Sequence, residues 1–216
     1  MIKEIQISIP QSYEDVTLRD YLRLQKEIKN YEDNEEAQTA ILVTYLCDIS
    51  LDILTKLGSD DFKTISMELA KWINNTDYPL QQIIRIDGKE YGFEPNLSTM
   101  SYGAYSDITK YENIQIDDNW AKIMSILYRP ITKKVRDTYE IEPYNGNINE
   151  DIWLKVPMSI HFGTMFFFVH LLADLQKGIL KYLKGTELPH SIVSILEKSG
   201  KITLPSWNLP TTIYQK

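Results

Sequence analysis

The stretch IIRIDGKEYGF, residues 83–93, limits most strongly the folds open to this chain. Apolar side chains alternate along it, at Ile84 and Ile86 before an Asp-Gly pair and at Tyr91 and Phe93 after that pair. Asp and Gly tolerate the positive φ angles that a two-residue primed turn requires. The pattern therefore predicts an antiparallel β-hairpin over residues 83–93.

Helical periodicity precedes the hairpin. Thr17 followed by Asp20 resembles a capping box, and the apolar residues after it recur at helical spacing, which predicts a helix from 18 to about 30. The acidic loop YEDNEEAQ leads into a second helix that is apolar nearly all round, which predicts that this helix is buried. One side of the second helix carries Ala37, Ile41, Thr44, Tyr45 and Asp48.

Two more helices are predicted from their capping residues. Ser59 is expected to cap a helix whose first turn holds Asp60 and Asp61. Carboxylates are favoured at the positive end of a helix, so we assign this pair to helix-end electrostatics and not to catalysis. Ser98 or Thr99 is expected to cap a short helix after the hairpin.

The most apolar segment runs from residue 156 to about residue 182. Its uninterrupted apolar part is shorter than the roughly twenty residues of a membrane span, and the segment contains His161, His170 and Asp174. It is predicted to be a central core helix. A period-two run at residues 4–9 predicts a short strand beside the hairpin. The fold class is therefore α+β and mainly α-helical, with a helical core and a small antiparallel β-hairpin element.

An apolar helical run stops within MSILYRPITKK, residues 124–134. Pro130 disfavours helical geometry at Arg129 and removes a backbone donor, so the helix is expected to end at Tyr128 or Arg129. The basic residues that follow suit the negative end of a helix, so they require no ligand. They are Arg129, Lys133, Lys134 and Arg136.

Composition and charge exclude some function classes. The 216 residues carry a net charge of −7, which argues against non-specific binding to nucleic acid or to an anionic membrane. The single cysteine, Cys47, cannot form an internal disulfide, which fits a reducing cytosol. Cys47 lies in a helix predicted to be buried, so we interpret it as a core residue and not as a nucleophile.

The common catalytic and metal-binding motifs are absent from the sequence, including glycine-rich phosphate loops, paired-cysteine metal spacing and nucleophile elbows. His161 and His170 are nine residues apart, which turns them to different faces of a helix. They are interpreted as two structural core histidines, with a metal-binding pair as the alternative. We expect no catalytic residue, no metal ligand and no cofactor.

Several segments together carry a family resemblance over residues 5–184. They are VTLRDYLRLQ, the hairpin, the step Gly103-Ala104-Tyr105-Ser106-Asp107, the stop Tyr128-Arg129-Pro130, and the turn Tyr144-Asn145-Gly146 before the long aromatic helix. In this combination the chain resembles a loose group of tailed-bacteriophage proteins, the tail assembly chaperones and related small virion-assembly proteins. The shared residues are framework residues, so the resemblance assigns no catalytic role.

The resemblance implies a non-enzymatic protein that acts without a cofactor in tail or virion assembly, or as a virion component. Its expected partners are other phage structural proteins of the tail, portal or neck, or further copies of itself, with no sequence-specific nucleic-acid binding and no membrane span. Its expected location is the host cytoplasm during assembly, or the virion. A small intracellular enzyme with an unrecognised site is the alternative.

The domain organisation is expected to separate the body from a tail. Residues 1–184 form the mainly helical domain, with a candidate internal boundary in the turn-rich stretch near 137–150. Residues 185–216 are expected to form a C-terminal helix and an extended tail, which helps to hold the protein in an assembly. The predicted partner-binding anchors of this tail are Trp207, Leu209, Ile213 and Tyr214.

Overall fold

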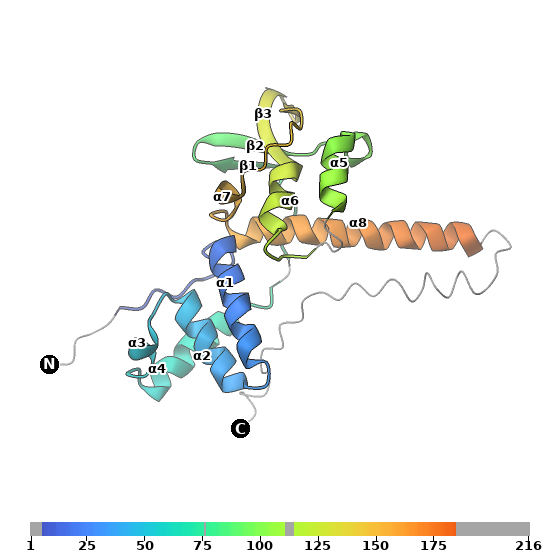
Figure 1. The fold of residues 1–216 in the computed structure, drawn as a ribbon. Helices are drawn as coiled ribbons and strands as arrows, with labels where there is room; N and C mark the ends of the chain where they lie inside the picture. Colours follow the sequence, from blue (N-terminus) through green and yellow to red (C-terminus); the bar gives the residue numbers. More distant parts are fainter. Residues whose placement is uncertain (1–5, 76, 111–114, 185–216) are drawn as a thin grey trace.

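A computed structural model describes residues 6–75, 77–110 and 115–184, with the backbone alone for 172–184 (Figure 1). The fold is α+β, as predicted, and combines helices with one antiparallel sheet. The N-terminal part holds α1 (Leu18–Ile28), η1 (Lys29–Tyr31), α2 (Glu35–Leu46), α3 (Leu51–Leu54) and α4 (Ser59–Ala70). After them come β1 (Ile83–Ile86), β2 (Lys89–Phe93), η2 (Leu97–Thr99), α5 (Tyr102–Thr109), α6 (Trp120–Leu127), β3 (Tyr128–Val135), β4 (Thr138–Ile141), α7 (Glu150–Trp153) and α8 (Met158–Lys184).

The predicted hairpin is confirmed. Strands β1 and β2 pair antiparallel, and Ile86 lies opposite Lys89 across a two-residue turn. Asp87 and Gly88 have φ angles of 49° and 79°, the left-handed geometry that such a turn needs. Local sequence alone is enough to specify this element.

The β element is larger than the predicted hairpin. The sheet has four strands in the order β1-β2-β3-β4. The basic stretch after Leu127 forms β3. Arg129 lies just past the end of α6, as predicted, whereas the helix-end interpretation is wrong for Lys133 and Lys134, which lie farther along the strand, and for Arg136, which lies in the turn after it. Residue Pro130 pairs opposite Tyr91 of β2, and the carbonyl oxygen of Pro130 accepts a hydrogen bond from the Glu142 amide at 2.9 Å. The backbone partners of this stretch thus come from β2, far earlier in the chain, and from the segment that follows β3 directly.

The strand predicted at 4–9 is wrong over its described part, because residues 6–10 belong to no strand. The chain just after them is instead tied to the start of α8. The amide of Met158 donates to the Val16 oxygen at 2.8 Å, and the amide of Ser159 donates to the Tyr13 oxygen at 3.1 Å. A period-two pattern forms a strand only where a strand edge is available to it.

The helix caps agree with the sequence in one case and differ in two. Thr17 caps α1, accepting a hydrogen bond from the Asp20 amide as predicted. Ser59 is the first residue of α4, and its N-cap is Gly58, which has no side chain to make a capping bond. Ser98 and Thr99 lie within η2, whereas Ser101 caps α5 by accepting from the Ala104 amide.

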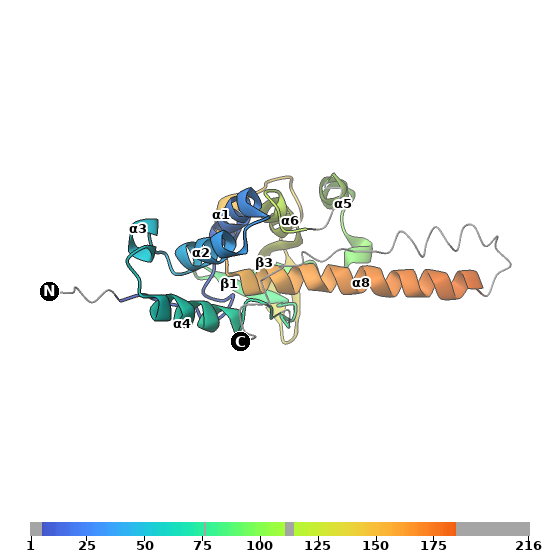
Figure 2. The same ribbon diagram turned by 90° about the horizontal axis from the view of Figure 1, so that it is seen from below.

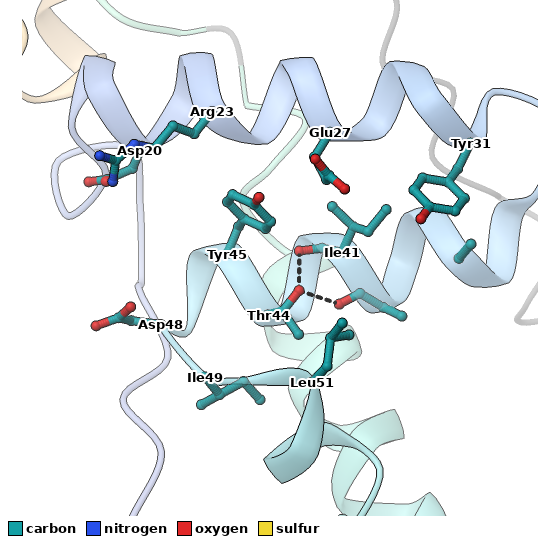
Figure 3. A pocket seen from close by; sticks show the side chains of 12 residues that line it. Asp20, Arg23, Glu27, Tyr31, Ile41, Thr44, Tyr45, Asp48, Ile49 and Leu51 are labelled. Carbon is teal, nitrogen blue, oxygen red and sulfur yellow. Dashed lines mark hydrogen bonds between the residues drawn. The ribbon is translucent and has the colours of Figure 1, made fainter.

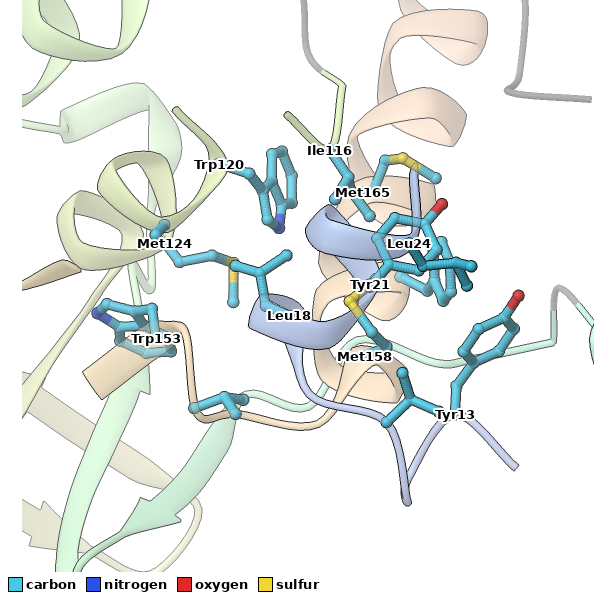
Figure 4. Packing of buried hydrophobic residues seen from close by; sticks show 14 of the residues in the cluster. Tyr13, Leu18, Tyr21, Leu24, Ile116, Trp120, Met124, Trp153, Met158 and Met165 are labelled. Carbon is cyan, nitrogen blue, oxygen red and sulfur yellow. The ribbon is translucent and has the colours of Figure 1, made fainter. Parts of the chain in front are cut away.

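The core lies where α1, α6, α7 and the first half of α8 meet (Figure 4). Large side chains from each of these helices are fully buried there, among them Leu18, Tyr21, Trp120, Met124, Trp153 and Met158. The second half of α8 extends away from this body in both ribbon views (Figures 1 and 2). Within the described ranges, no helix combines the length and the hydropathy that crossing a membrane requires.

The domain division stays a prediction. The stretch near 137–150 contains β4, which is a full member of the sheet. Residues 185–216, for which a helix and an extended tail are predicted, lie outside the described residues.

Candidate protein-binding groove

A groove of about 470 Å³ lies between α1, η1, α2 and the start of α3 (Figure 3). Its size is within the range of cavities that bind small ligands or receive a row of side chains from a partner. The apolar floor and the aromatic sides come mainly from Ala37, Ala40, Ile41, Tyr45, Ile49 and Leu51.

Small residues on α2 create the space. Ala37 and Ala40 are three residues apart and so lie on one face of the helix, where their methyl groups leave the gap next to α1 unfilled. Ile41 and Thr44 continue this face. The Thr44 hydroxyl bonds back to the Ala40 and Ile41 oxygens, both at 2.9 Å. The polar atom of Thr44 is therefore satisfied within α2, and the floor of the groove is effectively apolar.

A left-handed residue shapes one end of the groove. α2 ends at Leu46, and Asp48 follows with a φ angle of 50°. This conformation reverses the chain, so that the Ile49 amide donates to the Thr44 oxygen at 3.0 Å. The chain then directs Ile49 and Leu51 to the groove.

Apolar and aromatic surface is exposed around the groove. Leu51 is 65% exposed, Tyr31 is 42% exposed and Tyr45 is 38% exposed. In Figure 3 the side chains of Glu27 and Tyr31 extend from α1 and η1 toward α2, and the side chain of Tyr45 extends from α2 toward α1. Tyrosines in such positions offer rigid contact area with a polar end, a composition that is enriched at protein interfaces.

The charges in the groove are mainly negative. Asp20, Glu27 and Asp48 line it, against one guanidinium from Arg23. Asp20 also accepts a hydrogen bond from the Thr17 hydroxyl at 2.5 Å, which fixes the carboxylate at the start of α1. The groove thus combines an apolar floor with an acidic rim, which suits a ligand that is apolar on one side and positively charged beside it.

A second cavity, of about 550 Å³, lies between the segment 94–98, β4 and α8. Two carboxylates line it, Glu94 and Asp137, and Glu94 is nearly buried and pairs with Arg129 of β3. The side chains of Glu94 and Arg129 are 9% and 11% exposed. Because this carboxylate already neutralises a buried guanidinium, it contributes to the structure and is not available to a ligand.

His161 is a core residue, as predicted. Its Nδ1 accepts from the Trp120 Nε1–H at 3.1 Å, and its Nε2–H donates to the Trp153 oxygen at 3.1 Å. Burial lowers the pKa of His161 to about 3, so the ring is neutral at pH 7. Both ring nitrogens are engaged, which leaves no nitrogen for a metal. The same interpretation was wrong for His170, which is exposed on α8 because the body does not cover that face.

Other predicted residues have clear positions. Cys47 is buried on α2, and burial raises its thiol pKa to about 11, which makes the thiol a poor nucleophile. Asp60 and Asp61 lie in the first turn of α4, where they face solvent. The described part of the chain contains no group of three or more His, Cys, Asp or Glu residues arranged to hold a metal ion.

The sequence did not single out the groove. The predicted anchors Trp207, Leu209, Ile213 and Tyr214 lie outside the described residues. The signal for the groove was present, because the side of the second helix identified from the sequence, from Ala37 to Asp48, is the side that lines it. The predicted burial of this helix is confirmed for Ile41, Leu42, Val43 and Thr44, whereas Tyr45 and Asp48 are exposed. The periodicity did not show that this side of the helix borders an open groove.

Comparison of the chain with models of known protein families, with curated proteins and with solved structures gave no match in any of the three. The resemblance to tail assembly chaperones therefore stays a prediction from the sequence motifs.

Proposed function

We propose that this protein acts without catalysis in the assembly of a tailed-phage tail or virion, by binding other phage structural proteins. The single observation that carries the proposal is the open groove between α1 and α2, with its apolar floor and exposed tyrosines. Such a surface is typical of a site that receives a protein segment. The motif resemblance supplies the biological setting.

The partners are structural proteins of the tail, portal or neck, and the protein acts in the host cytoplasm during assembly. A transient chaperone and a permanent virion component would use the same groove in different ways. A chaperone releases its partner before the particle is complete, whereas a component stays bound to it. The mainly helical body provides the rigid support that either role needs.

The decisive experiment deletes the gene from the phage or prophage that encodes it. We expect electron microscopy to show tailless or incomplete particles, with normal tails restored when the gene is supplied in trans. Mass spectrometry of purified wild-type particles then separates the two roles, because a chaperone is depleted and a component is present at fixed stoichiometry. Particles with normal tails and normal titre from the deletion strain would refute the proposal.

A further inference from the structure

The groove is lined by two helices that pack against each other, and Figure 3 shows lining side chains from both α1 and α2. An amphipathic helix recognises such a groove by placing apolar side chains on its floor at helical spacing. Here Ala37, Ala40 and Ile41 form the floor that would receive them.

The charge of this region selects the partner. Residues 20–52, from which the groove lining comes, contain eight carboxylates and three basic side chains, and one of the eight, Asp52, is paired with Lys56. Of the three basic residues, Lys26 is paired with Asp118 at 2.8 Å and does not line the groove. Only Arg23 opposes the carboxylates of the lining, so a positively charged partner is favoured there and a negatively charged one is repelled.

Asp48 is an independent indication. Its left-handed φ is one that Asp tolerates better than most residues, but a carboxylate is disfavoured at the negative end of a helix. Asp48 thus contradicts the charge preference of its position, and its side chain lines the groove. Residues that contradict local preferences concentrate at functional sites.

From these observations we infer that the groove binds a basic amphipathic helix of a partner protein, with an apolar stripe on the floor and Lys or Arg beside Asp20, Glu27 and Asp48. The inference rests on the proposed function, because it specifies the chemistry of the partner that this function requires. A second copy of this chain, an acidic helix and a small molecule are the competing occupants.

The test uses two model peptides of 18 residues with the same leucine stripe, one with lysine at all other positions and one with glutamate. Each is titrated into the full-length protein by calorimetry, and the binding surface is mapped by amide chemical shifts in NMR spectra. We expect the lysine peptide to bind at least tenfold more tightly than the glutamate peptide, with the affinity falling as salt is raised. The shifts should centre on residues 37–51.

Three variants locate the charge effect. Asp48→Asn keeps a residue that tolerates left-handed geometry and removes the charge, and Glu27→Gln does the same on α1. Each should weaken the lysine peptide about threefold, the effect of one exposed ion pair. The matched control is Asp151→Asn, an exposed carboxylate at α7 away from the groove, which should leave the affinity unchanged.

Equal affinity for the two peptides, shifts outside the groove, or an equal loss in the control variant would overturn the inference. So would a change in oligomeric state on substitution at Asp48, since that result assigns the groove to a second copy. These outcomes do not depend on the deletion experiment. A normal deletion strain refutes the assembly role even if the peptide binds, and failed peptide binding refutes the basic helix even if tails are lost.

Discussion

Lowering the pH should destabilise the protein through His161. The neutral ring accepts from Trp120 at Nδ1 and donates to the Trp153 oxygen at Nε2, so it connects α6, α7 and α8. A protonated ring would lose its acceptor and place a charge in the core. Because its folded pKa is lower than its unfolded pKa, the unfolded state binds more protons at mildly acidic pH. The stabilisation is complete above pH 6.5 and is lost as the pH falls toward 3.

The size of the effect follows from the pKa. The folded pKa is about 3 and the ordinary value is 6.5. Each unit of difference corresponds to about 1.4 kcal/mol, so the full loss is about 5 kcal/mol. Between pH 7.5 and pH 5.0 the unfolded ring becomes protonated while the folded ring stays neutral. The expected loss over this interval is about 2 kcal/mol, a large fraction of the stability of a typical domain.

The assay is urea unfolding at pH 7.5 and pH 5.0 for the wild type, His161→Gln and His170→Gln. The pH-dependent loss should be about 2 kcal/mol smaller in His161→Gln than in the wild type. His170→Gln removes an exposed imidazole from the same helix and should behave as the wild type does. Taking the difference between the two pH values cancels the packing defect that the Gln substitution itself introduces.

An equal loss in the wild type and in His161→Gln would refute the reasoning. A direct check uses the wild-type protein, so that it does not depend on the variant folding. The NMR signals of the His161 ring should stay at their neutral positions down to pH 4.5. Movement of these signals between pH 7 and pH 5 would show that the buried ring accepts a proton.

Two further predictions concern stability, and urea unfolding tests both. Gly163→Ala should destabilise the protein by about 1–3 kcal/mol, because the added Cβ would lie 2.5 Å from the Pro79 oxygen. Gly103→Ala should stabilise it by about 0.5–1 kcal/mol, because the added Cβ would meet its nearest atom at 3.5 Å. Equal effects of the two substitutions would refute the close-contact argument. Arg129→Met should cost about 3–5 kcal/mol by leaving Glu94 buried and unpaired, and adding Glu94→Leu should recover much of that loss. A double variant no more stable than Arg129→Met would contradict this account.

The elements that the sequence predicted correctly depend on neighbouring residues. Thr17 caps α1 through Asp20, three positions away, and the Asp87-Gly88 turn needs only its own backbone angles. Strand β3 depends on distant pairing with β2, but β3 and β4 form a local hairpin across the Arg136-Asp137 turn, which the sequence analysis missed. Arg129 looked like a helix-end cation because its partner Glu94 lies 35 residues earlier in the chain. A single sequence contains no direct signal for such a pair.

The groove is a second feature that the sequence alone did not reveal. Periodicity identified the face of α2 that carries Ala37 and Ile41, but it could not show whether another element covers that face. Coverage is decided by how α1 and α3 are placed, and Asp48 sets the placement of α3 through its left-handed turn. The chemistry of the site could therefore be read from the sequence, whereas its openness required the structure.

The effect of Asp48 on the free energy of unfolding can be measured. Glycine adopts the left-handed conformation without the steric penalty of a Cβ atom, and it also removes the carboxylate from the negative end of α2. Asp48→Gly should therefore raise the free energy of unfolding by about 0.5–1 kcal/mol, while Asp48→Asn, which keeps the Cβ atom, should raise it less. Both variants should bind the lysine peptide more weakly than the wild type. Urea unfolding and calorimetry on the same protein samples measure the two effects, and a glycine variant that is less stable than the wild type would show that the Asp48 side chain supports the fold and not the groove.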